Sequence, residues 1–218
     1  AEDQDLTRET VNRVMIRRGK ETIYDDNGER IFPERDVQTA TVSMSPAEEQ
    51  LYERVTEYVR EVYNRSDQLN EPAVGFAMAL MQKRLVSSVG AIRETLRRRL
   101  HGLLEPDERS LSTDATAYLE GEDLDDSDRE QAEQELERLT VAQGDEALQK
   151  EIDTLQELVA MAEDLPVDTK ARKVKRYIEQ LFEEHPDEKL ILFTEYRDTL
   201  DYLLDLFADE PWADEILT

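Results

Sequence analysis

The sequence contains no cysteine and only two histidines, His101 and His185. The absence of cysteine excludes a disulfide framework, a thiolate nucleophile and a cysteine metal site. The two histidines lie far apart in the chain, which argues against a zinc cluster or a histidine-based catalytic triad. Each is interpreted as a residue near the end of a helix, and the sequence predicts no metal site.

Glycine is also scarce, with seven residues and no cluster among them. No GxxxxGK(S/T) loop is present to hold a triphosphate, and no DEAH-like acidic box follows a predicted strand to hold magnesium. Ser87 and Ser88 could serve as nucleophiles, but the sequence places no histidine base near them. Paired carboxylates are so abundant that no single pair stands out. The chain by itself is therefore predicted to have no catalytic and no cofactor-binding residues.

Long apolar runs are missing as well. The longest runs are a few residues, far short of the roughly 20 residues that a membrane-spanning helix needs. No signal peptide precedes the first predicted helix. We therefore expect a cytoplasmic protein with no membrane partner.

Basic residues are outnumbered: the chain has 53 acidic and 27 basic residues, a net charge of −26, and only seven of the basic residues are lysine. Such an excess repels itself where the screening length is about 8 Å, but it is tolerated in concentrated salt, where that length falls to about 3 Å. The composition therefore favours a salt-adapted cytoplasm. The alternative is an ordinary acidic protein with a solvating loop.

The first 45 residues predict a helix followed by β structure. Residues 6–20 form an amphipathic pattern with a basic end, and two β-prone runs over 22–32 flank Asn27-Gly28. Asn-Gly between such runs is a strong hairpin signal, because the tight turn needs positive φ at both central residues. Residues 37–44 alternate in polarity, which predicts a strand.

Residues 46–165 predict a helical bundle. Ser45-Pro46 followed by Glu48 is typical of a capped helix start. A second helix is expected from about Asn70 to Leu103, because its apolar residues recur every three or four positions. Residues 105–130 are expected to be a solvated acidic loop.

A calcium site in that loop is the alternative interpretation. Asp123, Asp125 and Asp128 supply oxygen donors, but the spacing lacks the central glycine and terminal glutamate of the standard calcium loop.

Residues 166–218 predict the beginning of an α/β domain. A helix starts near Asp168, four apolar residues over 190–193 are typical of a buried parallel strand, and a helix follows over 197–207. The predicted fold is therefore mainly α: a helical bundle with a small hairpin and strand region near the N-terminus and a partial α/β element at the C-terminus.

Six basic residues on the second predicted helix are candidates for phosphate or DNA binding. They are Lys83, Arg84, Arg93, Arg97, Arg98 and Arg99. The alternative is that they form ion pairs with the acidic middle segment inside the fold. The guanidinium fork suits both roles, so the sequence leaves the two open.

Several short runs occur in a particular order along the chain. They are Ile16-Arg17-Arg18-Gly19-Lys20, Ile31-Phe32-Pro33-Glu34-Arg35, Val42 to Glu48 followed by Leu51-Tyr52, Gln82 to Ser88, and Lys189 to Leu203. In this order they resemble the Swi/Snf-type superfamily-two helicases, particularly bacterial and archaeal members. Together with the composition, the resemblance points to a halophilic archaeon. About half of the chain is covered by recognisable pattern.

The resemblance implies an internal fragment of a DNA-dependent ATPase. Residues 1–45 would be the exit of the first RecA-like lobe, residues 46–165 a helical insertion, and residues 166–218 the beginning of the second lobe. The parent would use ATP and magnesium and track along double-stranded DNA, with its phosphate-binding loop and magnesium-holding acids upstream and its arginine finger downstream. The fragment would lack ATP hydrolysis of its own and could self-associate through exposed lobe surfaces.

Helicase motif IV would fall on four residues near nucleotide and DNA, Phe193, Thr194, Glu195 and Tyr196. The alternative function is a stand-alone acidic helical scaffold or adaptor. A hydrolase that uses local carboxylates is a third hypothesis, but it requires a glycine-rich substrate loop that the sequence lacks.

Overall fold

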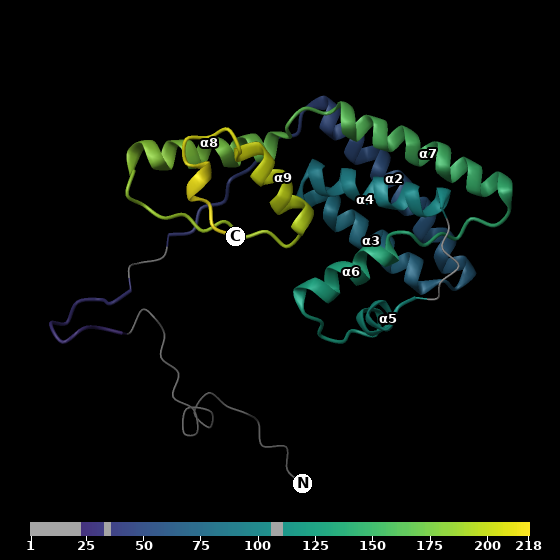
Figure 1. The fold of residues 1–218 in the computed structure, drawn as a ribbon, viewed down its shortest axis with the longest axis horizontal. Coiled ribbons are helices and arrows are strands. Elements are labelled where there is room, and N and C mark those ends of the chain that lie inside the picture. The colour runs from purple at the N-terminus through teal and green to yellow at the C-terminus, as the bar shows by residue number, and fades with distance from the viewer. Residues whose placement is uncertain (1–22, 33–35, 106–110) are drawn as a thin grey trace, which may run out of the picture. The chain divides into compact units, whose positions relative to one another are not determined.

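The computed structural model describes residues 23–32, 36–105 and 111–218 of the chain. It divides into two compact units, residues 1–41 and residues 42–218. The described residues are mainly helical and contain no strand (Figure 1). The helix predicted over 6–20 lies outside the described residues. No described helix is long and apolar enough to cross a membrane.

The hairpin expected over 22–32 is reduced to a turn with one isolated bridge between Tyr24 and Arg30. The Asp25 carboxylate accepts hydrogen bonds from the backbone N–H groups of Asn27 and Glu29 at 2.9 and 2.7 Å, and Gly28 takes a φ of +81°. The turn chemistry therefore acts as predicted. No strand forms, because a two-stranded ribbon without a third strand or a packed helix is marginal.

The strand predicted over 37–44 is wrong, because these residues are irregular and exposed in the structure. Alternating polarity stabilises a strand only when one face packs against a core and a neighbouring strand completes the hydrogen bonds. Neither is present among the described residues.

Helices form most of residues 42–218. In chain order they are α2 (Pro46–Leu69), α3 (Pro72–Ser87), α4 (Val89–Leu104), α5 (Thr113–Leu119), α6 (Asp126–Leu136), α7 (Asp145–Asp164), α8 (Thr169–Glu184), α9 (Arg197–Phe207) and the 3-10 turn η2 (Ala213–Glu215). The capping box of α2 is confirmed: Glu48 N donates to the Ser45 hydroxyl at 3.3 Å, and Ser45 N donates to the Glu48 carboxylate at 2.6 Å.

The single helix expected from about Asn70 to Leu103 is two helices, α3 and α4, that meet at Ser88. Ser88 has an extended backbone with φ −159° and ψ 159°, and its hydroxyl accepts from Ala91 N at 3.0 Å to cap α4. The backbone N–H of Val89, which the break leaves without a partner inside the helix, donates to Asp168 Oδ2 at 3.1 Å. The apolar spacing continues across the break, so periodicity alone did not reveal it.

The acidic stretch predicted as a loop over 105–130 is partly helical, although residues 120–125 remain a non-helical and mostly exposed segment; residues 106–110 lie outside the described residues. It contains α5 and the start of α6. Asp125 is one reason, because its carboxylate accepts from Ser127 N and Asp128 N at 3.0 and 2.9 Å and so caps α6. Asp125, one of the three residues considered as calcium ligands, therefore caps a helix.

The strand predicted over 190–193 does not form in the described residues, and its side chains are not buried. Leu190, Ile191, Leu192 and Phe193 are 44, 74, 46 and 87% exposed. They have an irregular backbone and lead into α9. The prediction of a strand buried on both faces was wrong for the chain as it stands, since no described strand pairs with this segment.

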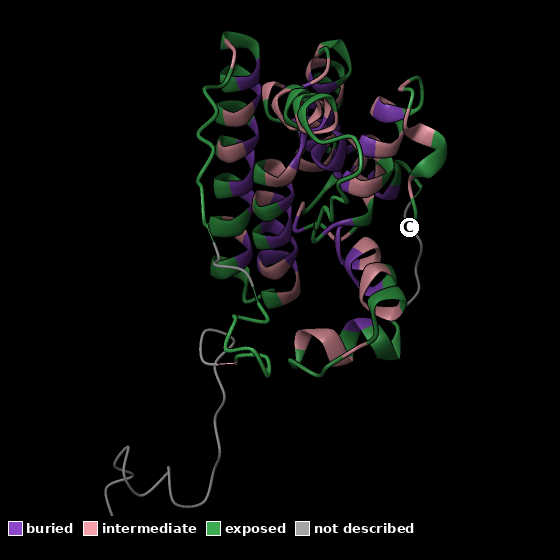
Figure 2. Ribbon diagram, turned by 90° about the vertical axis from the view of Figure 1, so that its left-hand side faces the viewer, coloured by how far each residue is buried: buried purple, intermediate pink, exposed green. Residues whose placement is uncertain are grey.

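Two apolar clusters organise residues 42–218. The larger cluster lies among α2, α3, α4, α6 and α7, and includes Leu51, Met78, Ile92, Leu136 and Leu155. The smaller cluster joins α8 and α9 through Ala171, Ile178, Leu203 and Phe207, with Trp212 packed against it. Figure 2 shows the buried residues on the helix faces that turn toward one another and the exposed residues on the outer faces. The bundle prediction is therefore confirmed in its helical character.

Candidate functional site

The six basic candidates divide into exposed and buried groups. Lys83 and Arg97 are exposed, and Arg93 and Arg98 are intermediate. Arg84 and Arg99 are only 2 and 0% exposed, so both guanidinium groups lie in the interior. The structure therefore separates residues that follow one another closely in sequence into surface positions and core positions.

Arg84, near the end of α3, is surrounded by three carboxylates. Its Nη2 donates to Glu133 Oε2 at 2.8 Å, and its Nη1 donates to Asp198 Oδ2. Its Nε lies 2.8 Å from Glu137 Oε1, an ion-pair distance, although the N–H bond is not aligned for a hydrogen bond. One buried arginine thus joins α3 to α6, to the residue that follows α6, and to the first turn of α9.

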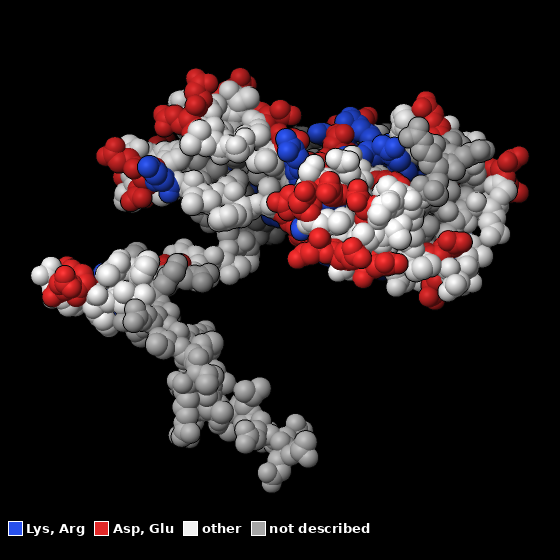
Figure 3. Space-filling view, turned by 60° about the horizontal axis from the view of Figure 1, so that its bottom comes forward, with Lys and Arg blue, Asp and Glu red and all other residues white. Residues whose placement is uncertain are grey.

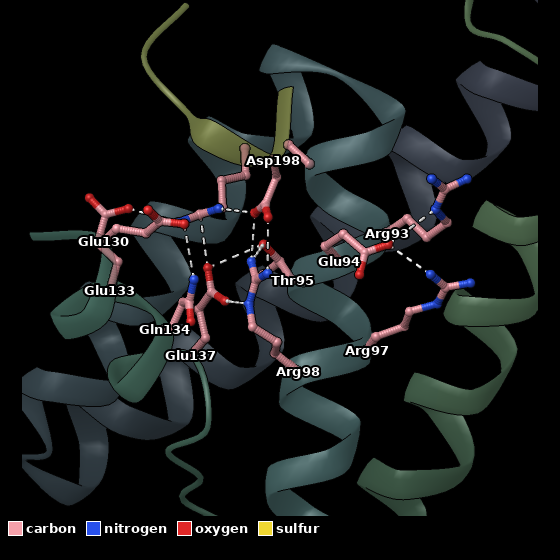
Figure 4. A network of polar contacts seen from close by, with 12 residues as sticks. Arg93, Glu94, Thr95, Arg97, Arg98, Glu130, Glu133, Gln134, Glu137 and Asp198 are labelled. Carbon is pink, nitrogen blue, oxygen red and sulfur yellow. Dashed lines mark hydrogen bonds and ion pairs between the residues drawn. The ribbon is translucent and has the colours of Figure 1, made fainter. Parts of the chain in front are cut away.

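Arg98, on α4, binds two of the same carboxylates. Its Nη1 and Nη2 donate to the two oxygens of Asp198 at 3.1 and 2.7 Å, and its Nε donates to Glu137 Oε2 at 2.7 Å. Figure 4 shows Asp198 reaching from α9 toward Arg98, with Glu137 at another edge of the guanidinium group. Such a two-pronged pair is geometrically specific as well as strong. We call Arg84, Arg98, Glu133, Glu137 and Asp198 the interhelix ion network.

The charges of the interhelix ion network nearly balance, with two guanidinium groups facing three carboxylates. Burial lowers the pKa of Arg98, but the hydrogen bond and charge of Asp198, together with Glu137, outweigh it, so the pKa is raised and the group stays charged. The Tyr118 hydroxyl donates to Glu133 at 2.7 Å and satisfies the remaining oxygen. Removing either arginine would leave one guanidinium group for three carboxylates, and an uncompensated charge in the interior is costly.

Arg99 forms a separate buried set of contacts on the other side of α4. Its Nη2 donates to Glu151 Oε1 at 2.8 Å, its Nη1 donates to the Glu137 carbonyl at 3.0 Å, and its Nε donates to the Tyr58 hydroxyl. The Tyr58 hydroxyl in turn donates to Glu151 at 2.9 Å. These contacts join α2, α4 and α7, so Arg99 is a structural residue of the bundle.

The four positions that the resemblance assigns to motif IV also divide. Phe193, Thr194 and Glu195 are exposed, whereas Tyr196 is 5% exposed and its ring lies under Arg84, with the guanidinium carbon 4.9 Å from the ring centroid. The structure thus places Tyr196 against the interhelix ion network. The other three positions face solvent, and Phe193 is the last residue of the exposed apolar run over 190–193.

Sequence reasoning missed the carboxylates that complete the site. Glu133, Glu137 and Asp198 are ordinary acids in a chain full of them, and none lies in a recognisable motif. The inward-facing residues beside them in sequence gave the only available signal. Glu133 follows Ala132 on the inward face of α6, and Asp198 precedes Thr199 on the inward face of α9.

The hydroxyl groups near this site do not form a catalytic arrangement. Ser87 and Ser88 hydroxyls each lie 2.9 Å from the Thr199 hydroxyl, and no histidine is among the partners found for them. His101 instead lies 3.4 Å from Glu105 at the end of α4. In the described part of the chain, no group of three or more acidic or histidine side chains is arranged to hold a metal ion.

Arg93 and Arg97, both on α4, form ion pairs with neighbouring acids near the surface. Arg97 binds Glu163 at 2.6 Å and Glu94 at 2.7 Å, and Arg93 lies 3.5 Å from the same Glu94. Figure 3 shows acidic side chains over much of the face in view, whereas basic side chains gather in a few places. Exposed pairs of this kind contribute about 0–1 kcal/mol, so a phosphate could compete for these cations.

No family model, curated protein or solved structure matches the chain.

Proposed function

We propose that the chain is an internal part of an ATP-dependent DNA translocase of the Swi/Snf type. In this role the helical bundle of α2 to α7 fixes the position of the segment that begins the second RecA-like lobe. ATP and magnesium would bind elsewhere in the parent, because this chain lacks the loop and acidic box that hold them.

The observation that carries the proposal is the attachment of Asp198 to the bundle. Asp198 lies two residues after Tyr196, the last motif IV position, and it is held by Arg84 from α3 and Arg98 from α4. Helix α9 cannot move relative to the bundle without breaking two part-buried, charge-assisted pairs. This is the property that a helical insertion needs if it is to set lobe geometry.

The exposed apolar run over 190–193 supports the same proposal. A segment of four apolar residues, exposed over 44 to 87% of each side chain, is unfavourable in water. Neighbouring strands of a RecA-like sheet would cover it and turn the segment into the strand that the sequence predicts. The partial α/β element remains part of this proposal.

DNA contact is the second part of the role. The candidates with solvent-accessible side chains are Lys83, Arg93 and Arg97. The side chains of Arg84 and Arg99 are buried and paired inside the fold. Duplex DNA carries about one negative charge per 1.7 Å of axis, so even a few such cations add affinity at low salt.

The reading frame that encodes the chain gives the first test. It should encode a GxxxxGK(S/T) loop and a DEAH-like box upstream, and their absence would favour the acidic scaffold or adaptor instead. The chain alone should show no thermal shift with ATP, because no residue here is expected to bind it.

The parent protein gives the second test through Asp198→Asn. Loss of the charge-assisted pairs should lower DNA-stimulated ATP turnover by about three- to tenfold, which corresponds to a coupling of about 1 kcal/mol. The control is Asp201→Asn, an exposed acid on the same helix with the same change in charge. Equal turnover in the two variants would contradict the proposed role in lobe geometry.

A further inference from the structure

One face of α8 carries polar and basic side chains at helical spacing. They are Thr169, Arg172, Lys173, Arg176, Tyr177 and Gln180, and together with Val42 and Ser43 they line a cavity of about 560 Å³. We call these six residues of α8 the α8 stripe. At a rise of about 1.5 Å per residue the stripe is about 16 Å long, and it lies outside the six basic residues singled out by the sequence.

The two arginines of the α8 stripe, Arg172 and Arg176, are available to a ligand. Arg172 and Arg176 are exposed, and neither forms an ion pair with another described residue. Lys175, on a different face of the same helix, is instead paired with Glu210. Among the described residues, no acidic side chain lines the cavity. In a chain with 53 acidic residues, a row of three cations without a carboxylate between them is a local exception.

The uncharged residues of the α8 stripe suit the same kind of ligand. Tyr177 is 51% exposed, and Lys173 lies over its ring, with Nζ 5.6 Å from the ring centroid. Tyr177 and Gln180 can donate hydrogen bonds from the hydroxyl and the amide. Arginine at positions 172 and 176 presents two planar forks about 5–6 Å apart along the helix, a geometry that matches phosphate oxygens.

We propose that the α8 stripe binds the phosphate backbone of a nucleic-acid duplex. The cations are arranged in a row and do not converge on a point, which fits a linear polyanion better than a single phosphate. The stripe has donors for phosphate oxygens but no element that enters a groove, so recognition is independent of base sequence. The phosphate chemistry follows from the stripe alone, whereas the choice of a duplex rests on the proposed function.

The experiment uses the 218-residue chain and a short fluorescent duplex, with anisotropy measured at about 50 to 200 mM salt. Arg172→Gln combined with Arg176→Gln should weaken binding about tenfold at low salt and reduce the slope of log K against log salt by about 2. The control is Arg60→Gln combined with Arg138→Gln, which removes two exposed arginines outside the stripe and leaves the net charge identical. Circular dichroism should show the same helix content in both variants.

Three outcomes would overturn the α8 stripe as a duplex site. They are no binding by the unaltered chain at low salt, equal loss in the stripe variant and the control, and competition by polyaspartate as strong as that by unlabelled duplex. The last would assign the stripe to protein carboxylates.

The two proposals fail separately. If Lys83→Gln, Arg93→Gln and Arg97→Gln together remove duplex binding and the stripe variant does not, the α8 stripe is wrong and the proposed function stands. If the reading frame lacks the ATPase motifs but the stripe variant loses affinity, the proposed function is wrong and the α8 stripe stands as a phosphate-binding site.

Discussion

Gly90 in α4 lies directly against the side chain of Tyr202 in α9, so closely that a Cβ atom added at Gly90 would be 2.4 Å from Cγ of Tyr202. Glycine inside a helix costs about 0.5–1 kcal/mol relative to alanine. The close approach of the two helices explains why α4 has a glycine at this position. Together with the interhelix ion network, it holds α9 against the bundle.

Gly90→Ala should therefore destabilise the protein, although alanine favours the helix. The overlap with Tyr202 forces side-chain or backbone shifts that cost about 1–3 kcal/mol. Urea denaturation followed by circular dichroism measures the change. Ala160→Gly, at an exposed position of α7, calibrates the propensity difference between the two residues. A Gly90→Ala variant more stable than the unaltered chain would show that α9 can move away freely.

Arg99→Met should be among the most destabilising single substitutions, at about 3–5 kcal/mol, because it leaves Glu151 buried without its cation. Adding Glu151→Gln to the variant should recover part of this loss. The matched control is Arg97→Met, two positions earlier on the exposed face, with an expected change within about 1 kcal/mol. Chemical denaturation of the four proteins gives the comparison, and similar losses for Arg97 and Arg99 would contradict the burial of Arg99.

Tyr196→Phe should leave stability at pH 9 unchanged or raise it by about 1 kcal/mol. The hydroxyl is buried and has no hydrogen-bond partner among the described residues, so its removal relieves an unsatisfied group, while the ring under Arg84 remains. Burial, with the charges of Glu195 and Glu133, raises the pKa of Tyr196 to about 12.

Tyr196→Phe also makes a prediction at alkaline pH. A pKa that is higher in the folded state than its unfolded value near 10 means that stability is complete below pH 10 and is lost as the pH rises toward 12. The unfolding free energy of Tyr196→Phe should therefore fall less between pH 9 and 11 than that of the unaltered chain. Parallel losses in the two proteins would show that this phenol does not contribute.

Glu48→Gln should remove a contribution to stability that depends on pH. Burial opposes ionisation of Glu48, but hydrogen bonds from Ser45 and Thr169 outweigh it and hold the pKa below the ordinary 4.5. The carboxylate therefore stabilises the fold above pH 4.5, and this contribution is lost as the pH falls through the lower folded value.

The difference in unfolding free energy between the unaltered chain and Glu48→Gln should thus be largest near pH 7, at about 1 kcal/mol for a lost helix cap, and should shrink below pH 4.5. Glu49→Gln, an exposed neighbour in the same helix turn, is the control for charge. A difference that stays constant with pH would exclude an ionised Glu48 as the source.

Concentrated salt should raise the melting temperature of the chain. A net charge of −26 repels itself, and the screening length falls from about 10 Å at 0.1 M to about 3 Å at 1 M. Differential scanning calorimetry in potassium chloride and potassium sulfate at equal ionic strength separates screening from solute exclusion. A melting temperature that does not change with chloride concentration would remove the argument for salt adaptation.

Features that depend on neighbouring residues were predictable. Ser45 and Glu48 lie three residues apart, so one turn of backbone decides whether they cap α2. The apolar faces of α2, α7, α8 and α9 follow from helical period in the same way. The turn at Asp25 to Gly28 formed as its residues predict, although the strands beside it did not.

The candidate site was only partly predictable. A run of arginines identified the right part of the chain, but the sequence left DNA binding and internal pairing open. Arg84 meets Asp198 across 114 positions and Glu133 across 49. No pattern within one helix indicates which acidic residue forms an ion pair with which arginine. Ser88 could likewise not be recognised as a break, since Thr199 is 111 positions away.

The sequence by itself therefore determined most of the helices, the cap of α2 and the strongly acidic character of the chain, because these depend on residues within a few turns of one another and on composition. Only the tertiary structure decided which arginines are buried, that α9 is joined to the bundle and that 190–193 remains exposed. Each of these depends on pairing between distant segments, where burial makes an unpaired charge costly and an unpaired strand unstable.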